Sequence, residues 1–210
     1  MIHQGTKRLE TERLVLRPFV PEDAQAMYDN WASDPEVTKY LMWPTHTSVA
    51  VSEMVLRDWV AQYDKPTCYQ WAIVLKDRGD EPLGAISVVQ DIDDRVRSAH
   101  VGYCIGRRWW HQGITSEAMK RVMDFLFDEV GVQRVEARHD TRNPHSGAVM
   151  RKCGMKYEGT HRSADWNNQG LCDAAYYALL ADERRVAPAS TPPISTDAPA
   201  DCRDCGEADA

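Results

Sequence analysis

The spacing of apolar residues predicts a set of strands in the first half of the chain. Apolar and charged residues alternate over residues 13–18, which is typical of a half-buried strand. Nearly continuous apolar runs at 69–75, 82–89 and 96–105 are separated by short polar turns. Strands joined by such turns pair with their neighbours in opposite directions, so we expect an antiparallel meander here.

Helical spacing of apolar residues replaces this alternation between the first strand and the meander. Residues 21–31 begin with a proline and two acids, which favour the first turn of a helix. A second, short helix is expected at 33–41, and a third begins at Thr47 or Ser48 and ends near residue 63. The apolar side of this third helix consists of Val51, Val55, Trp59 and Val60.

The stretch from residue 99 to residue 127 joins a strand to a long helix through a sharp turn. The helix over 117–127 places its apolar residues on one side, in phase with Ile114. These residues are Ala118, Val122, Phe125 and Leu126. A further strand at 132–139 completes a strand–helix–strand unit, which predicts a parallel pair with a right-handed crossover.

The next part of the chain predicts one short helix and a final hairpin. Residues 143–154 form a helix that ends at Gly154, because glycine adopts the left-handed conformation that terminates helices. The last two strands are expected at 155–162 and 171–180. A polar loop is expected between them, containing Asp165, Trp166 and Asn167.

Composition limits the class of protein. The 210 residues are 43% hydrophobic and 27% charged, which suffices for one domain with its own core. No uncharged apolar run reaches the length of a membrane span, and the first residues lack the apolar segment of a secretory signal. We therefore expect a cytoplasmic protein with no membrane partner.

Charge is distributed unevenly between a body and a tail. The net charge is −7, and residues 186–210 hold five acids and one base, so the body is only mildly acidic. Nucleic-acid binders present a basic face, so no nucleic-acid partner is expected, whereas cationic amines suit this charge. The tail is rich in proline and small residues and buries too little apolar area to become ordered. We predict a folded domain at 8–182 and a disordered acidic tail at 183–210.

The six cysteines indicate reduced thiols rather than a disulfide framework. Cys104 lies in a predicted buried strand, where a small core residue is a better interpretation than a nucleophile. Cys202 and Cys205 form a lone C-x-x-C pair. Zinc requires about four ligands, so no metal site is expected.

The turn before the long helix is a candidate binding site. The first N–H groups of a helix lack intrahelical partners, and the helix dipole makes this end electropositive. Gly113 carries no side chain, so a phosphate can approach these amides closely. The sequence matches neither the P-loop nor the dinucleotide-binding pattern, and an ordinary strand-to-helix turn is the alternative. Our hypothesis is that this turn holds the pyrophosphate of an acyl carrier.

Three segments resemble a known family. Residues 109–118, WWHQGITSEA, resemble the acetyl-CoA motif of the GNAT N-acetyltransferases. Residues 143–155 resemble the second motif of that family, with its N-x-x-S start and its closing glycine. Residues 9–18, LETERLVLRP, resemble the opening of the RimJ/RimL-like branch, which acetylates N-termini of ribosomal proteins. The resemblance covers about residues 8–182.

The resemblance implies an α+β (mixed α/β) GNAT fold, in which helices flank a twisted, mostly antiparallel sheet of about seven strands with a splayed parallel pair. It also implies acetyl-CoA as the co-substrate. The residues implied for the pyrophosphate are Gln112, Gly113, Ile114, Thr115 and Ser116, with Arg107 and Arg108 at the mouth of the site. Those implied for the pantetheine arm are Tyr103, Cys104, Ile105 and Asn143, and the N–H of Cys104 or Ile105 would face the thioester carbonyl. The two arginines fit a solvated corner equally well, and Asn143 also fits a helix cap.

Acetyl transfer from a thioester to an amine needs one group that takes the amine proton and another that protonates the leaving thiolate. The RimJ/RimL-like pattern implies Asp165 for the first role and Ser146 for the second. His100 is a second candidate for the base, because histidine titrates near neutral pH. No step requires a metal. Both candidates for the base stay open at this stage.

Two functions are compatible with these residues. The first is an acyltransferase, an acetyl-CoA-dependent N-acetyltransferase in which a primary amine attacks directly. Its acceptor is either a protein N-terminal amine, as in the ribosomal-protein branch, or a small-molecule amine. The second is a catalytically silent acyl-CoA-binding sensor or interaction module, which would lack the base. The resemblance is compatible with a monomer and with a homodimer.

Overall fold

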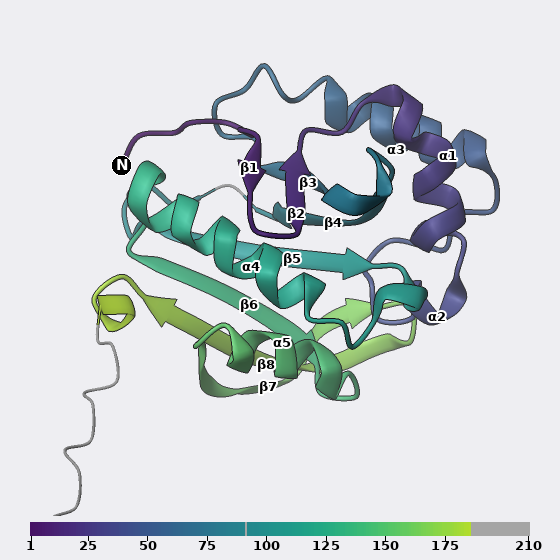
Figure 1. Ribbon diagram of the computed structural model, residues 1–210. Coiled ribbons are helices and arrows are strands. Elements are labelled where there is room, and N and C mark those ends of the chain that lie inside the picture. Colours follow the sequence, from purple (N-terminus) through teal and green to yellow (C-terminus); the bar gives the residue numbers. More distant parts are fainter. Residues whose placement is uncertain (91, 186–210) are drawn as a thin grey trace, which may run out of the picture.

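The computed structural model describes residues 1–90 and 92–185, which form one eight-stranded sheet with helices on both faces (Figure 1). The strand order is β1-β2-β3-β4-β5-β6-β8-β7. The strands are Leu9–Glu10 (β1), Leu14–Arg17 (β2), Gln70–Leu75 (β3), Pro82–Val88 (β4), Ser98–Ile105 (β5), Arg134–Asp140 (β6), Lys156–Asn167 (β7) and Gly170–Leu180 (β8). Neighbouring strands are antiparallel except β5 and β6, which are parallel. The predicted mixed fold is confirmed, and β1 adds an eighth strand at one edge.

The helices divide between the two faces of the sheet (Figure 1). The longer helix α4 (Ile114–Phe125) and α5 (Pro144–Lys152) pack over the larger hydrophobic cluster, which contains Trp71 and Phe125. Helices α1 (Ala24–Met27) and α3 (Val49–Val60) cover the smaller cluster on the opposite face. The sheet is therefore buried on both sides where the two clusters face each other, which explains the continuous apolar runs in its sequence.

The first predicted helix is built from three kinds of turn. Pro21–Asp23 form a 3-10 turn, α1 follows, and Tyr28–Ala32 form a wider π-helical turn. Trp31 lies in that last turn and is fully buried against Phe19, so it serves core packing. The short helix α2 (Pro35–Thr38) completes the segment.

A buried ion pair fixes this helical segment to the sheet. Arg17 at the end of β2 is 8% exposed and donates from Nη1 and Nη2 to the two oxygens of Asp23, each at 2.8 Å. Asp23 is also buried and accepts the backbone N–H of Val20 at 2.9 Å. The hydrogen bonds to Asp23 raise the pKa of Arg17 further, so the pair stays charged.

The final hairpin differs from the prediction of a long polar loop. Strand β7 continues to Asn167, and the turn before β8 consists of Asn168 and Gln169 alone. Asp165 is therefore a strand residue paired with Cys172, so its placement in a loop was wrong. Most of β7 is exposed to solvent on both faces, and polar residues on both faces leave no alternation that reveals a strand.

The described residues extend three residues beyond the predicted domain. Glu183–Arg185 form a 3-10 turn, and Arg184 is ion-paired with Asp128 at 2.7 Å. The predicted disorder of 186–210, with the Cys202 and Cys205 pair, lies outside the described residues. Of the helices within the described ranges, none has the length and apolar character needed to cross a bilayer.

Candidate active site

The parallel pair of strands opens into a gap shortly after it forms. The pairs between β5 and β6 are Ser98 with Arg134, Ala99 with Val135, and His100 with Glu136. Beyond His100, β5 continues to Ile105 while it pairs only with β4 on its other side. The two strands diverge from that point, so one edge of β5 faces an opening instead of a neighbour.

The alternation of the β-ladder decides which backbone groups face this gap. Val89 donates to the carbonyl of His100 and Gly106 donates to that of Leu83, each at 2.9 Å. In an antiparallel ladder alternate residues bond to the same neighbour, so Cys104 directs its N–H toward β4. The N–H groups of Tyr103 and Ile105 therefore point into the gap. Of the two backbone donors implied for the thioester carbonyl, the geometry keeps Ile105 and removes Cys104.

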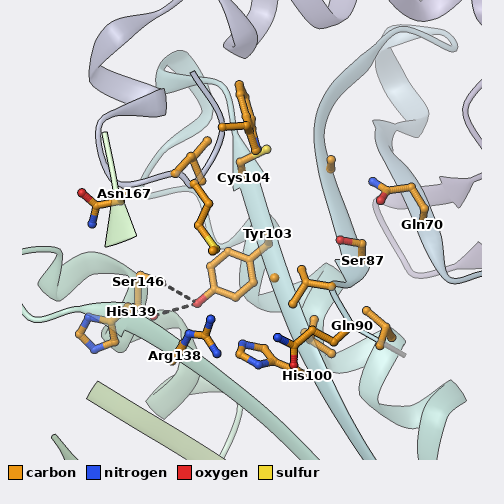
Figure 2. Close-up of a pocket in the computed structure, with 18 of the residues that line it drawn as sticks. Gln70, Ser87, Gln90, His100, Tyr103, Cys104, Arg138, His139, Ser146 and Asn167 are labelled. Atoms are coloured by element: carbon orange, nitrogen blue, oxygen red, sulfur yellow. Dashed lines mark hydrogen bonds between the residues drawn. The ribbon is translucent and has the colours of Figure 1, made fainter. Parts of the chain in front are cut away.

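Two cavities meet at the gap. Cavity 1, about 610 Å³, is lined by His100, Arg138 and Asp165 among others (Figure 2). Cavity 2, about 670 Å³, runs past the start of α4 and the start of α5. Six residues line both cavities: Tyr40, Leu41, Tyr103, Cys104, Asn143 and Ser146. The two cavities therefore adjoin at these residues.

The start of α4 lines cavity 2 with free amides. Gly113 precedes the helix with φ 75°, in the left-handed region that favours glycine. The N–H of Glu117 makes the first bond to the Gly113 carbonyl, so the N–H groups of Ile114, Thr115 and Ser116 precede the intrahelical ladder. A Cβ on Gly113 would lie 3.4 Å from the Nζ of Lys152. The turn thus combines open amides, a helix dipole and a nearby ammonium group, which suits an anion.

The other residues implied for the pyrophosphate lie differently. Arg107 is 61% exposed and pairs with Asp34 at 3.0 Å, and the Arg108 guanidinium stacks 4.0 Å from the ring centroid of Trp109. Gln112 donates its side-chain amide to the Arg108 carbonyl at 2.9 Å. These three side chains lie outside the lining of cavity 2.

A pair of hydroxyl groups stands at the junction of the cavities (Figure 2). Tyr103 donates to the backbone carbonyl of Ser146 at 2.9 Å, and the two hydroxyl oxygens are 3.1 Å apart. Burial raises the pKa of Tyr103 strongly, so the phenol stays protonated. Asn143 caps α5 by accepting the N–H of Ser146 at 3.4 Å, which orients the serine toward Tyr103.

His100 lies in cavity 1 at the last paired residue before the gap. Its side chain is 8% exposed, and its Nδ1 lies 3.9 Å from the Glu136 carboxylate. Burial lowers the pKa of His100 below its usual value near 6.5, and the charge of Arg138 lowers it further, against the opposing effects of Glu136 and Asp165. The imidazole is therefore neutral at pH 7 and able to accept a proton.

Asp165 also faces cavity 1, but both of its oxygens are already engaged. Its Oδ2 accepts from Nε of Arg138 at 2.6 Å, and its Oδ1 accepts from the N–H of Trp166 at 2.9 Å. Neither oxygen is therefore free of a hydrogen-bond donor. Structure thus brings the two candidate bases into the same cavity and leaves His100 the freer of the two.

A match to a family model decides the identity. The model described as the acetyltransferase (GNAT) domain matches residues 13–156, more than half of the chain. The chain belongs to the GNAT acetyltransferase family. It is 31% identical over 179 residues to the uncharacterized N-acetyltransferase p20 of Bacillus licheniformis, covering 83% of this chain and 97% of that relative.

Further comparisons define the branch of GNAT enzymes. The chain is 27% identical over 105 residues to the ribosomal-protein-serine acetyltransferase of Escherichia coli K12, covering 50% of this chain and 58% of the relative. The structure of RimL, a ribosomal L7/L12 alpha-N-protein acetyltransferase in complex with coenzyme A, matches with a TM-score of 0.74 at 20% identity. This match covers 84% of this chain and 99% of RimL. The chain is thus a GNAT-type N-acetyltransferase with RimJ/RimL-like relatives, as predicted.

Cys104 lines the junction of the two cavities in this GNAT domain. Burial raises the pKa of its thiol to about 12, so the thiolate needed of a nucleophile does not form near neutral pH. The free thiols among the described residues are Cys68, Cys104, Cys153 and Cys172. Within residues 1–90 and 92–185, no group of three or more histidine, cysteine, aspartate or glutamate side chains is placed to hold a metal ion.

A bridge between distant segments closes the outer side of cavity 1. Asn168, in the β7–β8 turn, donates its side-chain amide to the carbonyls of Thr38 and Trp43 at 2.9 and 2.8 Å. Its backbone N–H donates to the Leu41 carbonyl at 3.1 Å. Trp43 and the exposed Trp166 both line the cavity, so cavity 1 has an aromatic rim.

Sequence analysis missed several side chains that the fold brings to the two cavities. Lys152 faces the start of α4 from the end of α5, and Arg138 enters cavity 1 from β6. A lysine after a helix and an arginine in a strand have no local pattern that marks them as ligands. Tyr103 was expected to contact the pantetheine arm, but its pairing with Ser146 depends on the packing of α5 against β5 and has no sequence signal.

Proposed function

We propose that this chain transfers the acetyl group of acetyl-CoA to a primary amine that enters through cavity 1. The observation that supports this most is the meeting of cavities 1 and 2 at the β5–β6 gap, with Tyr103, Cys104 and Ser146 lining both. An amine on one side then reaches a thioester on the other without any covalent enzyme intermediate. Such positioning is a large part of the rate enhancement in a two-substrate reaction.

The residues of cavity 2 fit the carrier. Its diphosphate suits the amides at the start of α4, where Gly113 removes the Cβ that would stand beside Lys152. The N–H groups of Tyr103 and Ile105 suit the pantetheine arm and the thioester carbonyl, because they lack a strand partner on that edge. Acetyl-CoA, when bound, supplies the activated acetyl group, and the chain orients it with these donors.

His100 takes the proton of the attacking amine in this proposal. It lies in cavity 1, and its lowered pKa keeps it unprotonated at pH 7. Asp165 is hydrogen-bonded to Arg138 and to the N–H of Trp166. In this proposal it contributes a negative charge to the cavity and does not accept the proton. His100 then releases this proton to solvent by way of Glu136, whose partly exposed carboxylate lies 3.9 Å away.

Ser146 returns a proton to the leaving thiolate. Its hydroxyl lies in both cavities and is 3.1 Å from the hydroxyl of Tyr103, which stays protonated. Tyr103 keeps its own proton, which it donates to the Ser146 carbonyl, and so holds the serine in place. Solvent returns a proton to Ser146 after the thiol has left. This assignment gives the serine of the second GNAT motif a chemical role in addition to its place at the start of α5.

The proposal is tested with the full chain, acetyl-CoA and a panel of primary amines and peptides. Release of free thiol and the mass of the acetylated product are measured together. We expect turnover with at least one amine, and a loss of about 10²–10⁴-fold in kcat for Ser146→Ala. Ser48→Ala removes an exposed serine before α3 whose side chain makes no capping bond, and serves as the control. Binding of acetyl-CoA without turnover on every amine would instead indicate a sensor.

A further inference from the structure

Arg138 is a cation in cavity 1 that the reaction itself does not require. It lies on β6, two residues beyond the last pair with β5, and its side chain is 19% exposed. Alternate residues of a strand face the same side, so Arg138 shares its face with Glu136, the partner of His100. Figure 2 shows its guanidinium beside His100 and the Tyr103 hydroxyl, at the inner end of the cavity.

The contact with Asp165 leaves most of this guanidinium available. Asp165 takes only the Nε–H, through one oxygen, because its other oxygen is held by the N–H of Trp166. Tyr176 is the second partner: its hydroxyl interacts with the guanidinium, and its ring centroid lies 5.9 Å from the guanidinium carbon. A guanidinium has five N–H donors in a planar fork, and a carboxylate binds two of them side by side. The N–H groups that neither Asp165 nor Tyr176 takes remain for a ligand.

We propose that Arg138 binds the carboxylate of a free α-amino acid, whose amine is the group acetylated at the gap. This inference rests on the proposed function and adds the substrate class. In an α-amino acid one carbon separates the amine from the carboxylate. Two strand residues span about 7 Å, so the backbone of Arg138 lies within the length of a small molecule from the His100–Glu136 pair.

The charges of cavity 1 favour a carboxylate over other anions. Its described lining contains the cations Lys65 and Arg138 and the acids Asp140 and Asp165. A phosphate dianion would face both acids, whereas a carboxylate brings one charge to the fork. Asp140 is largely neutralised by Arg142, which donates to both of its oxygens.

A peptide N-terminus fits this cavity less well. Its first residue carries an amide in place of the carboxylate, and an amide offers the fork one weak acceptor. A site built to hydrogen-bond a charged group discriminates strongly against an analogue that lacks it, because its own donors are then left unpaired. The structure thus assigns a small zwitterion, rather than a protein end, to cavity 1.

The test compares each of the common L-amino acids with its carboxamide and with the corresponding decarboxylated amine. We expect the preferred amino acid to exceed its carboxamide in kcat/KM by about 10- to 100-fold, mostly through KM, as charge-assisted hydrogen bonds predict. The carboxamide has the less basic amine, so more of it is in the neutral, reactive form at a given pH. A preference for the acid therefore cannot arise from amine reactivity.

Variants on one strand assign the preference to Arg138. Arg138→Gln is expected to bring the acid-to-amide ratio close to 1, and Arg138→Lys to retain part of it, because a charge remains without the fork. Arg134→Gln removes the same charge from the same face of β6, where Arg134 pairs with Glu136 and Glu158, and should keep the ratio. The ratio is informative even if Arg138→Gln also slows the reaction by moving Asp165.

Each outcome decides the matter. Equal or better use of the carboxamide or a peptide by the wild-type chain overturns the carboxylate site while leaving acetyl transfer intact. An unchanged ratio in Arg138→Gln, with melting temperature preserved, shows that another group binds the acid. Absence of acetyl transfer to every amine, despite binding of acetyl-CoA, overturns the proposed function and this inference with it.

Discussion

Gly113→Ala tests where the carrier binds. Gly113 has φ 75°, and a Cβ there would point between the Nζ of Lys152, at 3.4 Å, and Nη2 of Arg13, at 3.8 Å. Both contacts are with the ends of flexible side chains, which can move aside. The methyl group would nevertheless occupy the space beside the free amides of α4, where we place the diphosphate. We expect weaker binding of acetyl-CoA by a protein that is still folded.

The two effects of this substitution have different sizes. A residue other than glycine in the left-handed region costs roughly 1–2 kcal/mol. For a domain of this size, the melting temperature falls by about 2–4 °C for each kcal/mol. Loss of one charge-assisted hydrogen bond from an amide to the diphosphate costs about 1.5–3 kcal/mol. We therefore expect the Kd for acetyl-CoA to rise by at least about tenfold.

Gly131→Ala provides the matched control at the other end of the same helical segment. Gly131 has φ 86°, and its Cβ would meet only the Cα of Met1, at 3.6 Å. It therefore carries the same backbone strain at a position outside both cavities. Thermal unfolding should show similar losses for both variants.

Isothermal titration with acetyl-CoA then separates the two glycines. Gly131→Ala should bind like the wild-type chain, and Gly113→Ala should bind weakly. Gly113→Trp, which fills the turn, should not bind at all. Tight binding by the tryptophan variant, or equal affinities for the two alanine variants, would show that the diphosphate lies elsewhere.

Three further predictions concern the base and the core. Burial lowers the pKa of His100, so kcat/KM corrected for ionisation of the amine should stay level down to a pH below 6.5 and fall at lower pH. In a pH–rate profile, His100→Gln should remove this acidic fall and slow the reaction by about 10²–10⁴-fold. An unchanged profile would exclude His100 as the base. Asp23→Ala removes the buried carboxylate of Arg17 and leaves the exposed Asp80 as its remaining acidic partner, 2.8 Å from Nε. Urea unfolding should therefore show a loss of about 3 kcal/mol, and a smaller loss when Arg17→Met is added would confirm the cause. A glycine-to-alanine substitution within a helix normally stabilises it, but the Cβ of Gly147→Ala would lie 2.5 Å from Nε2 of His139. Thermal unfolding should therefore show a net loss of about 1–2 kcal/mol in stability, and His139→Ala should relieve it. A stabilised Gly147→Ala variant would show that the imidazole moves away freely.

The parts of the fold that sequence predicts well are those in which burial is visible in the pattern. Strands β3 and β4 are apolar on both faces and stand out as continuous runs. Strand β7 was cut short because its residues face water on both sides and its extension to Asn167 depends only on pairing with β8. The π-helical turn at Tyr28–Ala32 was missed for a similar reason, since its residues favour an ordinary helix and the wider turn is seen only in the packed structure.

The candidate site was predictable where one local feature suffices. The left-handed Gly113 and the amides of the next residues follow from a glycine before a helix. The direction of a side chain does not follow in this way. Arg107 lies next to the turn in sequence, yet it pairs with Asp34, whereas Lys152 reaches the turn from another helix. The position of Arg138 near His100 can be recognised only once the pairing of β6 with β5 is known.

The short ladder between β5 and β6 has a consequence for engineering this protein. The edge of β5 that faces the gap presents backbone N–H groups that form no hydrogen bond with a neighbouring strand. Substitutions that extend the pairing past His100 would add rungs and strengthen the fold. In the proposed function, the same substitutions would close the gap through which the amine reaches the thioester. Screening variants for thermal stability alone would therefore select a more stable but inactive protein.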